Sequence, residues 1–240
     1  MAPQPEMNRQ EMIAAQALLS GLTELSARAT HDLLGPLNQA GSLLALFVKR
    51  YGGRLDPEAD KLLEFLQSAS LRMESVIAGV RKYIEIAGKP PSFGPVDLNV
   101  SLASSRSLLE RAISGSGAVI VSDSLPVVSA DAAQMVKIFE IIIGNSIKFR
   151  KPDAPPHIEV CPIGAGEVRG IKIADNGIGI DPQYRDSVFL PFRRLNGREY
   201  EGNGLGLAMA KLIVELHGGN IGIDSAPPHG THVKFTVRSV

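Results

Sequence analysis

The stretch from Ala29 to Gly41, ATHDLLGPLNQAG, combines side chains capable of chemistry with a residue that disturbs helices. His31 is followed directly by Asp32, and Pro36 comes five positions after the histidine. Proline inside a helix removes a backbone donor and clashes with the preceding turn, at a cost of about 3 kcal/mol. Either a helix ends at Pro36, or a bent helix presents His31 for chemistry.

Two glycine-rich segments in the second half of the chain have a composition that is typical of ligand binding through main-chain groups. The first, IKIADNGIGI, ends an expected strand at Asp175, and the second, REYEGNGLGLAMAKLIVELHGG, leads into an apolar-periodic helix. Their central glycines are Gly177 and Gly179 in the first run, and Gly202, Gly204 and Gly206 in the second. Glycine lets the backbone approach a ligand closely, and free amides at a helix N-terminus favour phosphate oxygens. Neither run is a P-loop or a Rossmann fingerprint, and each alone is also consistent with ordinary turns.

Polar side chains near these runs extend the same interpretation. Asp175, at a strand end, can accept a hydrogen bond from an exocyclic amine, which would select adenine. Asn145 and Lys148 lie three residues apart on one face of an expected helix. An amide oxygen suits Mg²⁺ and a lysine suits phosphate. The alternative for this pair is an ordinary asparagine and lysine near a helix end.

The segment 181–204 between the glycine runs has little periodic pattern. A loop of this length inside a compact domain is typically functional, such as a lid, or disordered. We expect Phe189 and Phe192 to anchor it to the body of the domain. Arg193 and Arg194 reach either phosphates or only solvent.

The elements that must position these residues fall into two halves. Residues 7–87 read as helical throughout, with YGGRLDPE as a turn, Asp56 as an N-cap and Pro57 at the first helical position. The apolar seam of the first helix is Leu18, Leu22, Leu25, Ala29, Leu33, Leu37, Ala40, Leu44 and Phe47, and that of the second is Leu62, Leu66, Ala69, Met73, Val76 and Val80. Consecutive steps of four around His31 and Pro36 form a stutter in the first seam.

Two long helices with apolar stripes bury themselves poorly as an isolated pair. We therefore expect a helical hairpin that forms a dimeric four-helix bundle with a second copy, as a homodimer. The alternative is a hairpin that packs on its own second domain.

Three prolines in KPPSFGP indicate a stiff linker over residues 89–95. Beyond it, strands and helices alternate, which predicts an α+β sandwich with helices on one face of a mixed sheet. The expected helices are 98–113, 131–149 and 205–217, and the expected strands are 118–122, 157–163, 168–175, 220–226 and 231–237, with VVSADAAQ leading into the second helix.

The composition limits the class of protein. Hydrophobic residues make up 44% of the 240 positions, and Lys+Arg and Asp+Glu are both 25, so no basic field indicates nucleic acid or a membrane surface. The single cysteine, Cys161, suggests a reducing compartment. The N-terminus lacks the order of a signal peptide, and no apolar run approaches the roughly 20 residues of a bilayer span. We expect a cytoplasmic protein without a membrane span.

Taken in order, the segments HDLLGPL, GNSIKF, DNGIGI, VFLPFRRL and GNGLGL resemble the H, N, G1, F and G2 boxes of the sensor histidine kinases of two-component systems. The resemblance covers nearly the whole chain. It implies a dimerisation and histidine phosphotransfer domain over 8–88, the linker over 89–95 and an ATP-binding domain of the Bergerat (GHKL) type over 96–240. HDLLGPL and FRKPD are most similar to the phytochrome-like branch.

The resemblance also implies roles for individual residues. His31 would be the phosphoacceptor that attacks the γ-phosphate of ATP, and Asp32 would hydrogen-bond its imidazole. Pro36 would form a hinge beside it. Asn145 would hold Mg²⁺, Lys148 the phosphates and Asp175 the adenine amino group. The pocket and its lid would be shaped by Gly177, Gly179, Gly202, Gly204, Leu205 and Gly206. The phosphoryl group would pass to an aspartate on the receiver domain of a response regulator, in a phosphorelay.

The sequence departs from the family pattern at three points. Ile141 stands four residues before Asn145, where a second asparagine is usual, so the kinase is expected to be slow. Glu140 would substitute only in part, since it lies about 100° around the helix. Gly35 stands where a polar residue usually positions water, which argues against phosphatase activity. Only about 30 residues precede His31, so the signal is expected from a separate sensor protein, unless the chain is an excised core.

Two other functions stay open on the sequence. The chain would be a phosphotransfer protein that relays phosphoryl groups through His31, with its ATP domain as a docking module, or a Bergerat-type ATPase unrelated to signalling. The remaining histidines indicate neither catalysis nor zinc: His217 reads as a helix C-cap, and His157 and His229 as loop or strand-edge residues.

Overall fold

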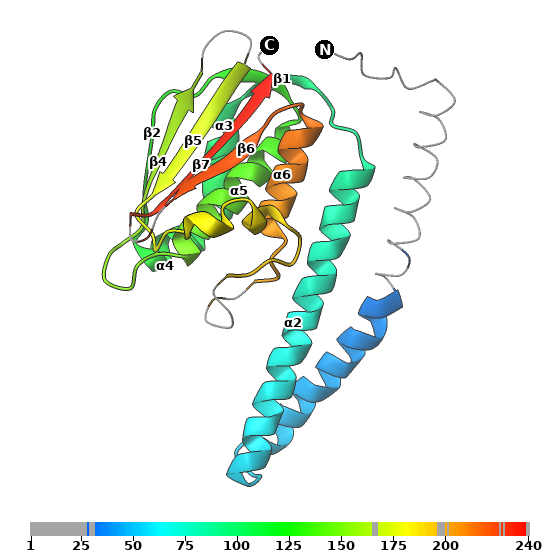
Figure 1. Ribbon diagram of the computed structural model, residues 1–240. Coiled ribbons are helices and arrows are strands. Elements are labelled where there is room, and N and C mark those ends of the chain that lie inside the picture. Colours follow the sequence, from blue (N-terminus) through cyan, green and yellow to red (C-terminus); the bar gives the residue numbers. More distant parts are fainter. Residues whose placement is uncertain are drawn as a thin grey trace. The chain divides into compact units, whose positions relative to one another are not determined.

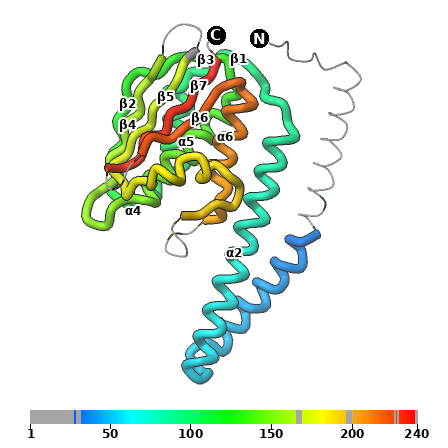
Figure 2. The backbone as a smooth tube through the Cα atoms, viewed as in Figure 1, coloured from blue at the N-terminus to red at the C-terminus, as the bar shows by residue number. Residues whose placement is uncertain are grey.

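The computed structural model describes Arg28 and residues 32–164, 168–195, 200, 202–225, 227 and 229–238. The chain divides between Lys89 and Pro90 into two compact units. The first is a helical hairpin and the second an α/β unit, as Figures 1 and 2 show by colour along the chain. His31 and the first part of the predicted seam, from Leu18 to Ala29, lie outside the described residues.

The hairpin consists of a helix over residues 32–51 and α2 (Pro57–Gly88). The first helix continues through Pro36, so the alternative that a helix ends there is wrong. Asp56 caps α2 as predicted: its Oδ1 accepts from the backbone N–H groups of Glu58 and Ala59 at 3.0 and 2.9 Å. Pro57 occupies the first turn, where its missing donor has no cost.

The two helices of the hairpin lie close together where Gly41 faces α2. A Cβ atom added to Gly41 would lie 3.0 Å from Ser70 Oγ and 2.8 Å from Glu74 Oε1. The less exposed stripe on α2 recurs in steps of four and three and comprises Leu63, Gln67, Ser70, Glu74 and Ile77. The predicted seam is the neighbouring stripe, and its Leu62, Leu66 and Met73 are 58%, 56% and 50% exposed. Within one chain, the first part of the predicted α2 seam is therefore exposed, whereas Leu37 and Leu44 of the first-helix seam are half-buried, as are Val76 and Val80 of the α2 seam.

The α/β unit contains seven strands, four α-helices and two short 3₁₀ turns within the described residues. In chain order they are β1 (Gly94–Asp97), α3 (Leu98–Leu108), α4 (Glu110–Ser116), β2 (Val119–Ser122), β3 (Val127–Ala130), α5 (Ala132–Lys148), β4 (His157–Ile163), β5 (Val168–Asp175), η1 (Pro182–Tyr184), η2 (Ser187–Phe189), α6 (Gly206–Leu216), β6 (Ile221–Ser225) and β7 (Thr231–Arg238).

The strands form a mixed five-stranded sheet in the order β2-β4-β5-β7-β6 and a two-stranded antiparallel sheet of β1 and β3. In the larger sheet only β2 and β4 run parallel. Residues alternate between buried and exposed along β4 and β7, which gives the sheet one apolar face. Helices α3, α5 and α6 cover that face (Figure 1), where the fully buried Phe139 of α5 meets Phe235 of β7 at 6.1 Å between ring centroids. The predicted mixed sheet with helices on one face is confirmed.

Two local expectations are wrong. The helix predicted over 98–113 is two helices, because α3 ends at Leu108 and α4 starts at Glu110. The hydroxyls of Ser104, Ser105 and Ser107 bond to backbone carbonyls within α3, which competes with regular helix continuation. Strand β1 begins at Gly94, inside the segment expected to be linker. Pro95 lacks a donor, which a short two-stranded ladder tolerates.

Among the described residues, no helix combines the length and the apolar character needed to cross a bilayer.

Candidate functional site

A pocket of about 540 Å³ lies in the α/β unit where the end of α5, the end of β5 and the start of α6 meet. Seven of the residues singled out in the sequence line it: Asn145, Lys148, Asp175, Gly179, Gly202, Gly204 and Gly206. They come from three separate parts of the chain, so residues that belong to different sequence motifs meet in one cavity of the folded unit.

The carboxylate of Asp175 is held in a fixed orientation by three hydrogen bonds. Its Oδ1 accepts from the backbone N–H groups of Gly177 and Thr231, at 2.9 and 3.0 Å. Its Oδ2 accepts from the hydroxyl of Ser146 at 2.8 Å. A carboxylate has about four acceptor positions, so one more donor fits at this strand end. An exocyclic amine that enters the pocket is such a donor.

Ser146 and Thr231 are site residues that the sequence analysis did not single out. Ser146 follows Asn145 directly, and Thr231 is the first residue of β7. Thr231 approaches Asp175 because the preceding residue is Gly230, at φ +86°, where an added Cβ would lie 1.8 Å from the backbone oxygen of Asp175. The sequence signal that could have pointed to Thr231 is a glycine directly before it, at the start of a strand with alternating apolar residues.

Cationic and aromatic side chains line the other side of the pocket. Lys148 Nζ lies 4.4 Å from the ring centroid of Phe149, and the rings of Phe149 and Tyr200 are 4.9 Å apart. Arg194 donates to the carbonyl of Tyr200 at 2.7 Å, and Arg193 lies 5.8 Å from the ring centroid of Tyr184. Both arginines line the pocket, which favours the phosphate interpretation over a purely solvated one.

The two phenylalanines of the connecting segment behave differently. Phe189 is buried, as expected of an anchor, whereas Phe192 is 53% exposed, so its predicted anchoring role is wrong. Phe192 has φ +63°, a left-handed conformation that costs a bulky residue energy. Its backbone lies against Gly204, so this segment contacts the site through main chain rather than through the Phe192 ring.

The N-terminus of α6 opens into the pocket. The cap residue Leu205 makes no side-chain cap hydrogen bond, while Gly206 and Leu207, in the first turn, line the cavity. Asn203 Oδ1 accepts from the Leu205 N–H at 3.1 Å, which orders the approach to the helix. First-turn amides that lack internal partners, together with the helix dipole, favour an anion.

Two predicted site residues lie behind the pocket rather than in its lining. Leu205 is 1% exposed, and Gly177 is buried with its N–H directed at Asp175. An added Cβ at Gly177 would lie 2.6 Å from the backbone oxygen of Phe149. Both residues therefore shape the cavity from beneath it.

The pocket offers a donor set that fits a magnesium ion bound together with a nucleotide. Within the part of the chain that the structure describes, no three His, Cys, Asp or Glu side chains gather to hold a metal. Mg²⁺ in nucleotide sites needs few protein ligands because phosphates and waters complete its octahedron. The amide of Asn145 lines the pocket and can supply one oxygen.

Ile141, one turn before Asn145, is an apolar residue that also makes an apolar packing contact. Ile141 Cγ2 lies 3.4 Å from a Cβ added to Gly206, so it packs α5 against the start of α6. Glu140, the expected partial substitute, pairs with Lys137 at 2.9 Å and does not line the pocket. The substitution of Glu140 for the missing amide is therefore not supported.

The remaining candidates lie apart from the pocket. Asp32 is exposed in the first helix of the hairpin, next to His31, which is outside the described residues. His217 is the C-cap of α6, as predicted. Burial, assisted by Asp123, raises the pKa of the Cys161 thiol, so this cysteine is a weak nucleophile.

Comparison with known proteins identifies the class of the α/β unit first. Residues 130–240 match the family model described as histidine kinase-, DNA gyrase B-, and HSP90-like ATPase. The unit is therefore an ATPase fold of the Bergerat (GHKL) type.

Relatives extend the match over most of the chain. It is 36% identical to Cyanobacterial phytochrome A of Nostoc sp. (strain PCC 7120) over 213 residues, 87% of this chain and 27% of that protein. It is 30% identical to the methanogenesis regulatory histidine kinase FilI of Methanothrix harundinacea over 214 residues, 87% of this chain and 24% of that protein. The chain belongs to the sensor histidine kinases and is similar to their phytochrome-like branch. It spans about a quarter of the length of these curated relatives.

Two solved structures share the fold. Full-length ShkA in complex with AMPPNP aligns with a TM-score of 0.67 and 22% identity, covering 90% of this chain and 46% of that one. Histidine kinase ThkA in complex with response regulator protein TrrA aligns with a TM-score of 0.62 and 20% identity, covering 96% of this chain and 66% of that one.

Replacing Gly204 by alanine is expected to disturb the pocket. Gly204 has φ +73°, and an added Cβ would lie 2.8 Å from the backbone carbon of Phe192, so alanine is both strained and obstructed. We expect Gly204→Ala to lower the free energy of unfolding by about 1–3 kcal/mol, measured by thermal or urea unfolding. Gly222→Ala is the control, since nothing lies within 4 Å of its added Cβ. Equal stabilities of the two variants would contradict the geometry.

Proposed function

We propose that the chain is an ATP-dependent protein-histidine kinase that phosphorylates His31 and passes the phosphoryl group to an aspartate of a response regulator. The observation that carries the proposal is the meeting, in one pocket, of a fixed carboxylate, Asp175, and the open N-terminus of α6. One end of this cavity accepts an amine, and the other binds an anion. A purine nucleotide with an exocyclic amine and a polyphosphate chain has both groups.

The adenine amino group would donate to Asp175. Its carboxylate keeps its orientation before the ligand arrives, because Gly177, Thr231 and Ser146 already donate to it. Preorganisation of this kind lowers the entropy cost of binding. A guanine base presents a carbonyl oxygen where adenine presents its amine. Neither this oxygen nor the Asp175 carboxylate can donate a hydrogen bond to the other, so adenine is the favoured base.

The phosphates would lie between the N-terminus of α6 and the cations of Lys148, Arg193 and Arg194. All three cationic side chains line the pocket, and Gly202 leaves space for Lys148 Nζ, which would be 2.8 Å from an added Cβ. Phosphoryl transfer depends chiefly on positioning and on neutralising negative charge. Asn145 would hold Mg²⁺, which supplies charge neutralisation between the phosphate oxygens. ShkA, whose fold this chain shares, is known in complex with AMPPNP, which supports a nucleotide in the corresponding cavity.

In the transfer step, one ring nitrogen of His31 would attack the γ-phosphorus while the bond to the ADP oxygen breaks. Asp32 would accept a hydrogen bond from the other ring N–H and stabilise the positive charge that develops on the imidazole. Its exposure on the first helix is compatible with this role. The phosphoryl group would then pass to a receiver aspartate, and the complex of ThkA with TrrA supports a response regulator as partner.

The homodimer stays part of this proposal. The seam residues Leu62, Leu66 and Met73 are at least half exposed in the single chain, although their spacing is that of a coiled-coil core. A second copy would bury it in a four-helix bundle, the arrangement predicted from the sequence. A separate sensor protein and a cytoplasmic location likewise stay predictions.

The phosphotransfer and ATPase alternatives are separated from the kinase by one labelling experiment. We expect the wild type to incorporate ³²P from γ-labelled ATP, and His31→Ala to incorporate none, because the acceptor nitrogen is lost. His232→Ala, an exposed histidine on β7, is the control and should label normally. A wild type that accepts phosphate only from a phosphorylated regulator would favour the phosphotransfer protein. Undiminished release of inorganic phosphate in His31→Ala would favour the simple ATPase.

Asp175→Asn is expected to weaken ATP binding by about ten-fold or more, since the amide nitrogen donates where the carboxylate oxygen accepted. The amide oxygen can still accept from Gly177 and Thr231, so the fold should persist. Isothermal titration calorimetry measures the affinity, and circular dichroism checks the fold. Asp224→Asn, on the exposed surface of β6, is the matched control. Unchanged affinity in Asp175→Asn would remove this residue from the base site.

Leu66→Glu is expected to separate the dimer, because it introduces a charge into the proposed seam. Light scattering after size exclusion should give about half the mass of the wild type. Ser68→Glu, an exposed position two residues along α2 and about 160° away around the helix, is the control. A Leu66→Glu protein of undiminished mass would contradict a dimer built through this stripe.

A further inference from the structure

Outside the pocket, a buried histidine and an aspartate join three separate segments. Asp131 Oδ1 accepts from the Gln134 N–H at 3.1 Å and caps α5, while its Oδ2 accepts from the Ser92 N–H at 3.0 Å. The Asp131 N–H donates to His217 Nε2 at 3.0 Å. The Phe93 ring lies edge-on to the imidazole at 5.2 Å. We call Ser92, Phe93, Asp131 and His217 the tether junction.

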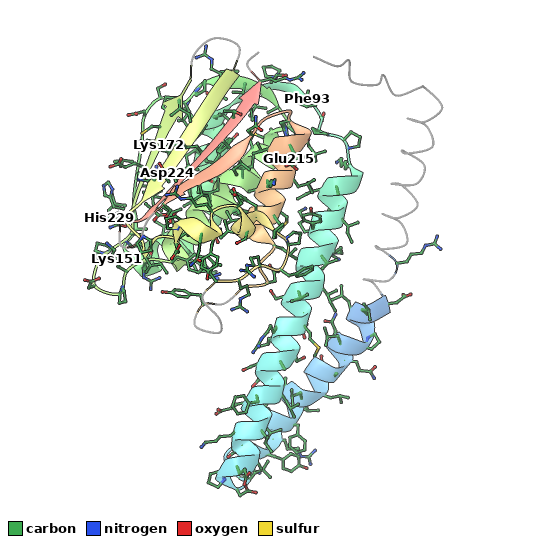
Figure 3. All side chains as sticks on the ribbon, in the orientation of Figure 1. Phe93, Lys151, Lys172, Glu215, Asp224 and His229 are labelled. Atoms are coloured by element: carbon green, nitrogen blue, oxygen red, sulfur yellow. The ribbon has the colours of Figure 1, made fainter. Side chains whose placement is uncertain are left out.

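The hydrogen bonds define the state of the imidazole. Because Nε2 accepts a bond, the proton is on Nδ1, which donates to the carbonyl of Ile213 at 2.8 Å. His217 is 1% exposed, so both bonds are shielded from water. Figure 3 labels Phe93 near the C-terminal end of α6, where Glu215 is also labelled. The imidazole therefore links the end of α6, the start of α5 and the segment before β1.

The Asp131 carboxylate is an acceptor throughout the physiological range. Burial acts to raise its pKa, but hydrogen bonds from the N–H groups of Ser92, Gln134 and Ala133, with the nearby His217, outweigh burial and lower it from 3.8. Because the pKa of Asp131 is lower in the folded state, the ionised carboxylate stabilises the fold fully at any pH above its pKa in the unfolded state. This stabilisation is lost only as the pH falls through the lower folded-state value. The junction therefore holds at neutral pH.

The junction lies at the far ends of the two helices that form the pocket. Asp131 precedes Asn145 by 14 positions, or about 21 Å along α5. His217 ends α6, whereas Gly206, at its start, lines the pocket. A change at the junction should therefore leave nucleotide binding largely intact.

The tether junction also determines how many residues connect the hairpin to the α/β unit. Helix α2 ends at Gly88 and β1 starts at Gly94, so five residues connect them. Because Ser92 and Phe93 contact the α/β unit, only Lys89, Pro90 and Pro91 lie between α2 and these attached residues. Fully extended, three residues reach about 10 Å and five reach about 17 Å. Two of the three are prolines, which stiffen the segment.

We propose that Asp131 and His217 are positioning residues that fix the effective length of the tether between the ATP-binding unit and the hairpin that carries His31. The proposal rests on the proposed kinase function. A short, stiff tether raises the effective concentration of the bound ATP around the acceptor histidine. Releasing Ser92 and Phe93 lengthens the tether from three to five residues. This change lowers the effective concentration about two-fold by the −3/2 power of length, and further through lost stiffness.

Asp131→Asn tests the junction without removing the helix cap. The amide oxygen still caps α5, since asparagine is a good N-cap, but its NH₂ group faces the Ser92 N–H, donor against donor. Phe93→Ala removes the ring contact and leaves the cap intact. Asp97→Asn is the matched control, because Asp97 caps α3 and makes no contact with the tether in the described hydrogen bonds.

The first measurement does not depend on kinase activity. Spin labels at Glu64→Cys on α2 and Glu215→Cys on α6, in a Cys161→Ser background, report the distribution of distances between the two units. Hydrogen exchange of a peptide containing Ser92 reports the bond to Asp131. We expect Asp131→Asn and Phe93→Ala to broaden the distance distribution, Asp131→Asn to speed exchange at Ser92, and Asp97→Asn to do neither. An unchanged distribution would overturn the proposal.

The second measurement is the initial rate of ³²P incorporation at saturating ATP, with ATP affinity measured alongside. We expect a two- to ten-fold lower rate in Asp131→Asn, with affinity within two-fold of the wild type. A broadened distribution with an unchanged rate would overturn the positioning role. If the wild type binds ATP but never labels His31, the proposed kinase function fails and the positioning role with it. The distance measurement then still decides whether the junction fixes the tether.

Discussion

The antiparallel packing of α5 against α6 is the constraint on which both ends of the α/β unit depend. At one end, Asn145 and Lys148 meet the opening turn of α6 in the pocket. At the other end, Asp131 meets His217. Ile141 packs against Gly206 at the pocket end, and the buried faces of both helices lie on the sheet. The relative register of the two helices thus sets the distances between the groups that line the pocket, and a one-turn slip would change these distances by about 5 Å.

The residues that sequence reasoning found are those whose signal is local. Asp175 ends an alternating strand, and Gly206 begins an apolar-periodic helix, so neighbouring residues suffice to assign each of them. Of the two residues that it missed, Thr231 depends on pairing across the sheet. Thr231 reaches Asp175 because β5 and β7 are antiparallel with Ala174 opposite His232, and 56 positions separate the two partners. No single-sequence pattern fixes that register, which is set by how the strands bury their apolar face together.

Element type was predictable, and its fine structure was not. The periodicity of 131–149 and 205–217 predicted α5 and α6 to within a residue or two, since both helices bury an apolar stripe. The break at Leu109 escaped because serine hydroxyls compete with the helix through bonds that only the folded backbone displays. Strand β1 was not predicted because two prolines precede it and Pro95 lies within its four residues, so the segment has the composition of a linker. His217 was recognised as a cap, but its bond to Asp131 joins residues 86 apart.

Under the proposed function, charge neutralisation would allow the site to work with an isoleucine one turn before Asn145. An amide at position 141 would add a polar contact but no net charge. In the proposed site, the charge of a triphosphate would be balanced by Mg²⁺, by Lys148, Arg193 and Arg194, which line the pocket, and by the dipole of α6. Ile141 instead contributes an apolar contact that holds the start of α6 against α5. A rigid helix N-terminus keeps its amides aimed at one place, which is the condition under which they stabilise an anion most effectively. Under the proposed function, an isoleucine in place of an amide at position 141 would therefore lose one phosphate contact and keep the α6 N-terminus in a fixed position.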